Sequence, residues 1–392
     1  MFRPYIKRTY ILVLVAMINL LLVYISYQSY SFTKSEDYEL KIEAATIMKN
    51  ALDLTKGLDN PKDIDRFKSG LVGVDSTSSQ MTTKRGFLES KVATTNPNFA
   101  AVFIDWFSAI GISSDISNTP DTVAVSMTGS FPGANIAFLA ACKASNVYPV
   151  IISSIGSSSW GANQIDKTWI EIENTLIDAN FFSYRSKAFS LGGDNDQLDE
   201  LPINIKQMLE NKIIKNNYDI ISDDQMQGAV NERIRKYKEQ SSNYKAYVNI
   251  GGSSASLGDS TTSKMYLPGL IFGKDEAIAD ALDDEYYDEY EYEQEIIPVV
   301  EYFLSEQKIP VINVRNINNL CEWYGLPYSN LSFNDDNVKI GAGDLFGVKT
   351  KHRLSVVWLS TLASLALIAW LAISSIIQVN NKMKEIDNDS II

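Results

Sequence analysis

Histidine and cysteine are nearly absent from this chain of 392 residues, which has one histidine and two cysteines. The histidine, His352, stands directly beside a long apolar segment, so a Ser-His-Asp triad elsewhere in the chain is excluded. The common zinc sites need several histidine or cysteine ligands and are excluded as well. Cys142 and Cys321 do not make a disulfide scaffold, although an oxidising compartment would permit a bridge between them.

Phosphate-binding glycine motifs are also missing. The sequence contains no G-x-x-x-x-G-K-S/T, and no G-x-G-x-x-G with a ribose-binding acid at the usual distance. Asp194 and Asp196 are ligand types that suit calcium or magnesium, but a solvated turn explains them better. Basic residues are outnumbered, with 35 Lys and Arg against 48 Asp and Glu, which does not fit a nucleic-acid binder. We therefore predict no cofactor, no metal and no nucleic-acid partner.

Two long segments without charge lie near the chain ends, 18 residues at 10–27 and 24 residues at 354–377. At a rise of about 1.5 Å per residue, each reaches across a hydrocarbon core of about 30 Å as a helix. The first is longer than the apolar core of a signal peptide and lacks a small-residue cleavage site, which favours a retained anchor. Both segments are therefore predicted to be transmembrane helices in a lipid bilayer.

The charges that flank the first apolar segment predict the orientation in the membrane. Three basic residues among the first eight favour a cytoplasmic N-terminus, although three more at 349–353 oppose it. The prediction is a two-pass protein of the cell (inner) membrane whose main domain is extracytoplasmic. Its parts are a cytoplasmic flank at 1–9, spans at 10–27 and 354–377, a domain at 28–353 with an acidic, low-complexity insertion at 275–295, and a cytoplasmic tail at 378–392.

The segment 121–145 shows how the main domain is built. Thr122–Met127 is an apolar, β-branched run that predicts a buried strand, and residues 128–133 form a turn of small residues. A nearly all-apolar helix follows at 134–144. Strand, turn and helix in this order are the first half of a βαβ unit. The turn of such a unit lies at the carboxyl edge of the sheet, where ligands of open α/β sheets bind.

The same order of strand, turn and helix recurs about five times, beginning near residues 122, 148, 186, 244 and 309. This alternation predicts an α/β fold of the Rossmann-like kind, with a mostly parallel sheet flanked by helices. We expect a loop with short strand pieces at 60–91, and a helix that starts at Asn96 and Pro97. Further helices are expected at 36–57, 167–179, 203–216, 224–240, 296–307 and 316–324.

Four of the turns are rich in glycine and serine and would meet at one edge of a parallel sheet. Such turns expose backbone N–H groups and hydroxyls, and the helices that follow add partial positive charge, so together they suit a carboxylate or a phosphate. The alternative is that glycine and serine only make tight turns. The predicted ligand-binding residues are Thr128, Gly129, Ser130, Gly133, Gly156, Ser157, Ser158, Asn163, Gly251, Gly252 and Ser253.

Ser130 is a weak candidate for a catalytic nucleophile. It occupies the place of a nucleophile-elbow serine, although its surroundings are not G-x-S-x-G. With histidine excluded, a Ser-Lys pair is the nucleophile arrangement left, and Lys84, Lys167 and Lys187 are candidate bases.

A basic cluster on the predicted helix at 224–240 is a second candidate surface. Arg233, Arg235 and Lys236 would contact a polyanion there. The alternative is an ordinary charged solvent face, because Glu232 and Glu239 balance the cluster.

Several stretches, taken in order, resemble the poly-gamma-glutamate system protein family. They are TTNPNFAA (94–101), DTVAVSMTGSFPGANIAFLAAC (121–142), PVIISSIGSSSWGAN (149–163), YVNIGGSSASLG (247–258) and IPVINVRNINNLCEWYGLP (309–327). The resemblance covers about residues 10–330, without the acidic run. It implies an accessory membrane protein of capsular poly-gamma-glutamate synthesis or export in the bacterial cell envelope, whose partners are the synthase or export membrane proteins.

Three functions are compatible with these residues. In the first, the domain binds the anionic polymer, its precursor or the synthase through the edge turns. In the second, it is a hydrolase or transferase that acts on γ-glutamyl bonds or another anionic polymer, with Ser130 or Ser157 at its centre. In the third, it is a scaffold. Because the chain is acidic overall and would repel a polyanion, the first function requires donors focused in one place.

Overall fold

The computed structural model describes residues 9–56, 69–112, 119–259, 262–273, 296–328 and 339–389. They divide into a terminal unit, Met1–Ser35 with Gly347–Ile392, and a central unit, Glu36–Phe346. Each unit has its own sheet. The predicted acidic insertion at 275–295 lies outside the described residues, as does all but the last residue of the predicted flank at 1–9.

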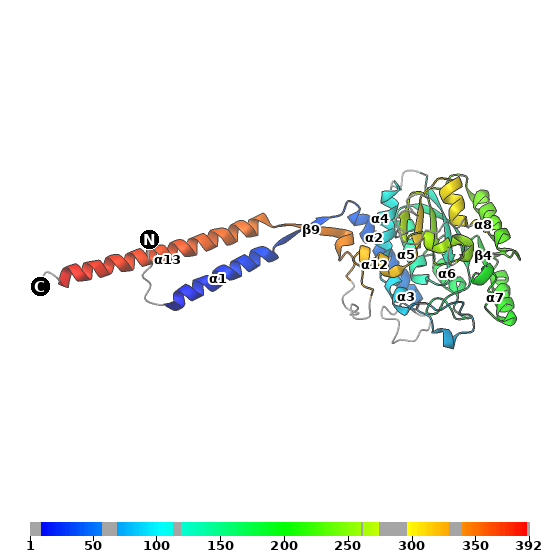
Figure 1. Ribbon diagram of the computed structural model, residues 1–392, viewed down its shortest axis with the longest axis horizontal. Helices are drawn as coiled ribbons and strands as arrows, with labels where there is room; N and C mark the ends of the chain where they lie inside the picture. Colours follow the sequence, from blue (N-terminus) through cyan, green and yellow to red (C-terminus); the bar gives the residue numbers. More distant parts are fainter. Residues whose placement is uncertain are drawn as a thin grey trace, which may run out of the picture. The chain divides into compact units, whose positions relative to one another are not determined.

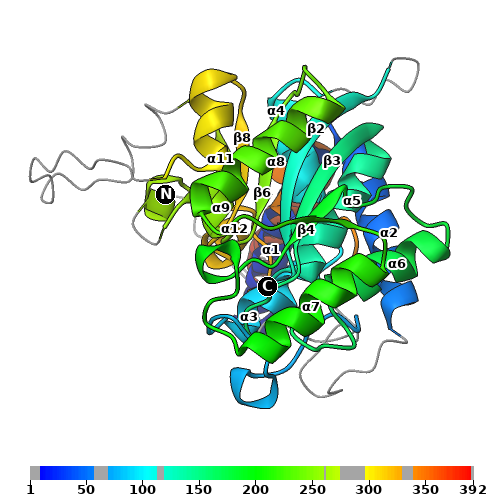
Figure 2. The same cartoon turned by 90° about the vertical axis from the view of Figure 1, so that its right-hand side faces the viewer.

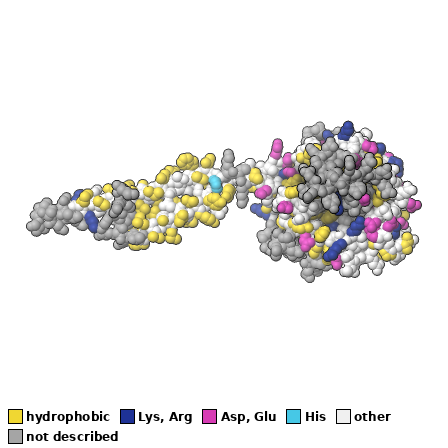
Figure 3. Space-filling model, in the orientation of Figure 1, with side chains coloured by type: hydrophobic (Ala, Val, Ile, Leu, Met, Phe, Trp, Pro, Cys, Tyr) yellow, Lys and Arg dark blue, Asp and Glu magenta, His cyan; other side chains and the backbone are white. Residues whose placement is uncertain are grey.

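The terminal unit consists of two long helices and two short strands, α1 (Thr9–Gln28), β1 (Tyr30–Lys34), β9 (Gly347–His352) and α13 (Leu354–Asp389) (Figure 1). The two strands pair antiparallel. Two segments of the described chain are long and apolar enough to cross a membrane, Tyr10–Gln28 and Leu354–Lys384. Hydrophobic side chains cover much of their surface (Figure 3). The predicted apolar helices near both ends are thus confirmed as helices, and α13 extends well into the predicted tail.

The central unit is built on a seven-stranded sheet with the order β5-β4-β3-β2-β6-β8-β7. All neighbouring strands are parallel except β7, which pairs antiparallel with β8 at the edge. The strands are β2 (Asp121–Thr128), β3 (Val147–Ser154), β4 (Ala188–Ser190), β5 (Asp219–Ile221), β6 (Tyr247–Ile250), β7 (Gly269–Ile271) and β8 (Val311–Val314). The predicted mixed α/β fold with a mostly parallel sheet is therefore confirmed, and β5 and β7 are two edge strands that the sequence pattern did not predict.

Helices cover both faces of this sheet (Figure 2). One face packs against α2 (Tyr38–Thr55), α4 (Phe99–Ala109), α5 (Pro132–Ala144), α6 (Trp169–Asp178), α7 (Ile203–Lys215) and α12 (Ile317–Trp323). The other packs against α8 (Met226–Gln240), α9 (Ser254–Leu257), α11 (Val299–Glu301) and the π-helical turn η4 (Tyr302–Glu306). Each face of the sheet has its own hydrophobic core, and successive residues of β2 point into alternate ones. Val123 and Val125 belong to the first core and Ala124 to the second, as the two-residue period of a strand requires.

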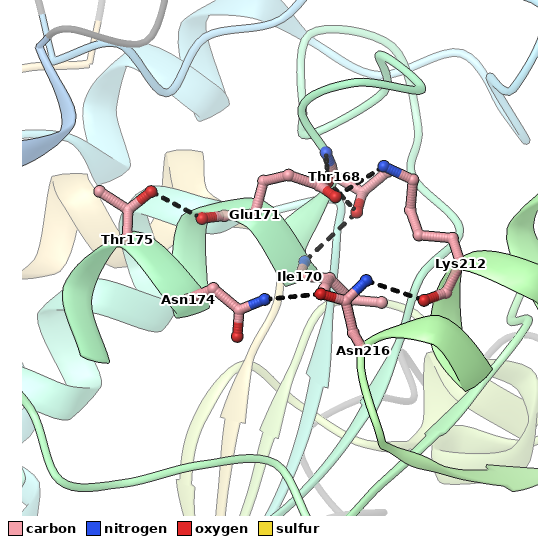
Figure 4. A network of polar contacts seen from close by, with 7 residues as sticks. All are labelled: Thr168, Ile170, Glu171, Asn174, Thr175, Lys212 and Asn216. Atoms are coloured by element: carbon pink, nitrogen blue, oxygen red, sulfur yellow. Dashed lines mark hydrogen bonds and ion pairs between the residues drawn. The ribbon is translucent and has the colours of Figure 1, made fainter. Parts of the chain in front are cut away.

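Polar side chains fix the start of α6 and join it to α7 (Figure 4). The hydroxyl of Thr168 accepts a hydrogen bond from the Ile170 N–H at 3.3 Å. In return, Glu171 accepts one from the Thr168 N–H at 2.8 Å, so two N–H groups that a helix start leaves open are satisfied. Glu171 also accepts from Lys212 of α7 at 2.6 Å. This capping box explains why the predicted helix at 167–179 begins at Trp169.

Two predictions in the first third of the domain are wrong. Residues 60–68 of the expected loop lie outside the described residues, and its last four residues, 88–91, belong to a helix, α3 (Leu88–Thr94). The helix expected to start at Asn96 and Pro97 begins instead at Phe99, because Asn96 accepts a hydrogen bond from the Asn98 N–H at 3.0 Å and closes a turn between the two helices. Short 3₁₀ helices complete the unit, η1 (Ser76–Ser78), η2 (Asp194–Asp196), η3 (Thr262–Met265) and η6 (Asp344–Phe346).

Candidate functional site

The direction in which the chain winds through the sheet reverses between β2 and β6. From β2 the chain proceeds outward through β3, β4 and β5, and it then returns to β6 on the other side of β2. The loops after these strands leave the sheet in opposite directions, so a crevice is expected at their carboxyl ends. A pocket of about 750 Å³ lies there. Residues that follow β2, β3, β4, β6 and β8 all line it.

About half of the predicted ligand-binding residues line this pocket. They are Thr128, Ser130, Gly156, Ser158, Gly252 and Ser253. The turn after β4 reaches the pocket through Gly193. The four glycine- and serine-rich turns therefore meet at one edge of the sheet, as the parallel arrangement predicts.

The other predicted residues support the turns from behind. Asn163 holds the 74–82 loop, since its amide donates to Val74 O at 2.8 Å and to Thr82 Oγ1 at 2.9 Å. Ser157 is fully buried and donates to Gly129 O at 3.0 Å. Gly133 and Gly251 allow close packing, because a Cβ would overlap Thr94 O at the first and Thr128 Oγ1 at the second. The five predicted residues that do not line the pocket are Gly129, Gly133, Ser157, Asn163 and Gly251.

Basic side chains dominate the charge of the pocket, and only one of them, Lys84, is a residue that the sequence pattern points to. The five are Lys84, Arg85, Lys91, Lys264 and Arg315. No aspartate or glutamate of the described chain lines the pocket. Lys84 forms an exposed ion pair with Asp194 at 2.7 Å, whereas the other four make no ion pair with any described residue. The pocket is thus a local concentration of positive charge on a chain of net charge −13.

Arg315 shows how one of these cations is held. It directly follows β8, and its Nη1 donates a hydrogen bond of 2.6 Å to Ser263 O. Burial lowers the pKa of its guanidinium from the ordinary value, yet arginine stays protonated in proteins. A half-buried arginine that has no counter-ion among the described residues attracts an anion more strongly than an exposed one, because less water screens it.

Lys91 is the most buried of the five, with 3% of its surface exposed. It extends from α3 across the turn after β2, where its Nζ donates to Ser130 O at 2.5 Å and to Ser158 Oγ at 2.9 Å. The Nζ also lies 3.5 Å from the centre of the Phe131 ring. Burial lowers the pKa of Lys91 to about 7, since no described carboxylate stabilises the charged form.

The two serines beside Lys91 are linked to each other. The Ser158 N–H donates to Ser130 Oγ at 3.0 Å. Of the three lysines predicted as candidate bases, Lys167 and Lys187 do not line the pocket, and Lys84 lines it but is paired with Asp194. The loop that precedes α3 also approaches, because a Cβ on Gly86 would lie 3.1 Å from Ser158 Oγ. The sequence did not predict the contact between Lys91 and Ser158, because Lys91 lies in the segment 60–91 that was expected to be a loop.

The basic cluster of α8 lies away from the pocket, which none of its three residues lines. Arg233 is 2% exposed and its Nη2 lies 2.6 Å from Asp196 Oδ2. Arg235 is paired with Glu239, and Lys236 contacts Asp219 at 2.8 Å. Arg233 therefore offers no surface to a polyanion, and the other two already have counter-ions.

Metal-ligand types do not gather in the described part of the chain. It contains no group of three or more histidine, cysteine or acidic side chains placed to hold a metal ion. Asp194 and Asp196 are engaged by Lys84 and Arg233. Cys142 and Cys321 are both free and buried, so they form no bridge with each other.

Comparison of the chain with family models, with curated proteins and with solved structures gave no match. The pocket and the sequence resemblance described above are therefore the two grounds on which a function can rest.

Proposed function

We propose that the central unit binds an anionic, carboxylate-rich polymer or its precursor in the pocket at the sheet edge. The observation that carries this proposal is the lining of five basic side chains without an acidic one among the described residues. Carboxylates are bound best by arginine and lysine together with hydroxyl or N–H donors. The buried hydroxyl of Ser253, which has no hydrogen-bond partner among the described residues, lies in the same pocket. The position of the pocket at the switch point supports a Rossmann-like use of the fold.

In the cell, we propose that this protein is an accessory component of capsular poly-γ-glutamate synthesis or export. The two apolar helices would hold it in the inner membrane with the central unit outside the cytoplasm, next to the synthase or export proteins. Poly-γ-glutamate carries one free carboxylate per residue, which suits a row of cations. Because the whole chain carries a net charge of −13, a polyanion would be repelled by the protein as a whole and would need the basic side chains of the pocket for contact.

Binding is tested with fluorescently labelled poly-γ-glutamate and the full-length protein in detergent micelles. We expect saturable binding, measured by fluorescence anisotropy, that weakens as salt is added. The variant Lys264→Gln/Arg315→Gln should bind at least about tenfold more weakly, a change of about 1.4 kcal/mol. The variant Arg235→Gln/Lys236→Gln on α8 is the matched control and should bind like the wild type.

Two results would overturn the binding proposal. One is binding that survives in the pocket variant but is lost in the α8 variant, which would move the polymer to that helix. The other is equal binding of an uncharged dextran, which would show that charge does not matter.

Orientation is tested separately, with a single engineered cysteine at the exposed Ser242. Both natural cysteines are fully buried and will not react in the folded protein. Labelling of Ser242→Cys in intact cells by a membrane-impermeant maleimide is expected if the central unit is extracytoplasmic. Labelling only after lysis would place it inside. Loss of surface poly-γ-glutamate on deletion of the gene tests the role in capsule formation.

A further inference from the structure

We propose that Ser158 and Lys91 form a Ser-Lys catalytic pair for acyl transfer, with Ser158 as nucleophile and Lys91 as general base. The pair itself rests on geometry alone. The choice of a carboxylate-bearing amide or ester as substrate rests on the function proposed above, because the cations of the same pocket would hold the carboxylates.

The contact between the two side chains has the distance that proton transfer requires. Lys91 Nζ lies 2.9 Å from Ser158 Oγ, within the range of a nucleophile and its base. Both residues line the pocket, so a substrate there reaches the hydroxyl. When the amine is neutral, its lone pair can accept the Ser158 hydroxyl proton while an N–H still donates to Ser130 O.

The surroundings of Lys91 favour that neutral form. The amine is almost completely buried, and its described neighbours are a carbonyl, a hydroxyl and an aromatic ring. Another buried lysine of the central unit, Lys41, differs because it faces Asp105 at 2.7 Å. Lys91 is thus placed as a base, whereas Lys41 is placed as one half of an ion pair.

Ser130 acts as a positioning residue in this arrangement. Its carbonyl holds the amine of Lys91, and its hydroxyl accepts the Ser158 N–H at 3.0 Å. The α5 helix begins at Pro132, two residues later. The positive end of its dipole therefore lies at the same turn, where it would stabilise negative charge on a substrate oxygen.

The reaction proceeds in two balanced halves. Ser158 Oγ attacks the carbonyl carbon and its proton moves to Lys91; the C–N bond then breaks, and Lys91 returns that proton to the leaving amine. A water molecule next attacks the ester on Ser158 and gives a proton to Lys91, after which the ester C–O bond breaks and Ser158 regains the proton. One amide and one water yield one carboxylic acid and one amine, and an amine acceptor in place of water would give transfer.

A fluorophosphonate probe tests the nucleophile in the full-length protein in detergent. An activated serine forms an O–P bond and releases fluoride, so the adduct is mapped to one residue by peptide mass spectrometry. We expect labelling of Ser158, its absence in Ser158→Ala, and a wild-type level in Ser241→Ala, a serine outside the pocket. The labelling rate should rise with pH around the pKa of Lys91, about 7.

The variant Lys91→Arg tests the base, because arginine is also a long basic side chain but stays protonated and cannot accept a proton near neutral pH. We expect it to label about 10²- to 10⁴-fold more slowly and to lose the pH dependence. Release of p-nitroaniline from γ-glutamyl-p-nitroanilide is expected for the wild type and not for Ser158→Ala. A circular dichroism spectrum and a urea-unfolding midpoint equal to those of the wild type show that Ser158→Ala is folded.

Four outcomes decide between this proposal and the previous one or overturn it. A folded wild type that takes up no probe at Ser158, or a Lys91→Arg variant that labels as fast as the wild type, overturns the catalytic pair and leaves polymer binding standing. Labelling of Ser158 with no affinity for poly-γ-glutamate overturns the binding function and supports the pair on a different substrate. Labelling of Ser130 in place of Ser158 also overturns the assignment.

Discussion

Arg233 and Asp196 form an ion pair inside the central unit, with a separation of 2.6 Å and side-chain exposures of 2% and 0%. Arg233 also donates to Ser190 Oγ at 2.6 Å, and Ser190 donates to the second Asp196 oxygen at 2.9 Å. The pair joins α8 to the turn after β4, where Asn195 and Asp196 both have positive φ. A conformation of that kind is costly and needs support from its surroundings. The ion pair therefore holds one wall of the pocket in place.

Asp196→Asn should destabilise the protein by about 3–5 kcal/mol, because it leaves the buried guanidinium of Arg233 without a counter-charge. Arg235→Gln, on the exposed side of the same helix, should cost less than about 1 kcal/mol. Urea unfolding followed by tryptophan fluorescence measures both. Equal effects of the two substitutions would mean that burial of the pair contributes nothing.

The stability of the central unit should depend on the protonation of Lys91. Below pH 7 the amine is charged in both the folded and the unfolded chain, and burial of the charge is fully costly. Above pH 7 the folded chain releases the proton, while the unfolded chain keeps it up to the ordinary pKa of 10.5. The free energy of unfolding should therefore rise with pH, by up to about 1.4 kcal/mol per pH unit relative to Lys91→Met.

Urea unfolding of the wild type and of Lys91→Met at several pH values between about 6 and 9 measures this difference. The variant keeps the length of the side chain and removes the titrating group. A difference that does not change with pH would show that Lys91 is protonated in the folded protein throughout, and it would argue against a role as base.

Two neighbouring glycines at the end of β6 should respond differently to alanine. Gly251 has a φ of +103°, and a Cβ added there would overlap Thr128 Oγ1. We expect Gly251→Ala to destabilise the protein by about 1–3 kcal/mol. A Cβ added at Gly252 would meet no described atom within 4 Å, so Gly252→Ala should change stability by less than about 0.5 kcal/mol. Urea unfolding measures both variants, and a comparable loss in the two would contradict the tight packing of β2 against the β6 turn.

A polar contact inside the terminal unit should stabilise its two long helices. Asn19 of α1 accepts a hydrogen bond from Ser364 of α13. Asn19→Leu should weaken the helix pair by about 0.6–2 kcal/mol, the range measured for hydrogen bonds between membrane helices. Thr361→Ala is the control, since Thr361 donates to Val357 O within its own helix at 2.8 Å.

The midpoint of unfolding by sodium dodecyl sulfate in mixed micelles reports on this pairing. A larger shift for Thr361→Ala than for Asn19→Leu would show that the contact between the helices is not what holds them together.

Local patterns were sufficient to predict the larger elements. The β-branched run at 122–127 and the apolar segment behind it became β2 and α5, because alternation and helix propensity act within a few residues of sequence. The three-residue strands β5 and β7 were missed. Such short strands exist only because a neighbouring strand supplies hydrogen bonds, and no local pattern encodes that neighbour.

The sequence by itself determined that this chain has an α/β domain with glycine- and serine-rich turns at one sheet edge and an apolar helix near each end. Only the tertiary structure decided which side chains surround those turns. In the folded chain, Lys91, from a segment expected to be loop, lies beside Ser158. Arg233, expected at the surface, is buried in an ion pair with Asp196. The physical reason is that a basic side chain acquires its chemistry from burial and from its neighbours, and these depend on residues far apart in the chain.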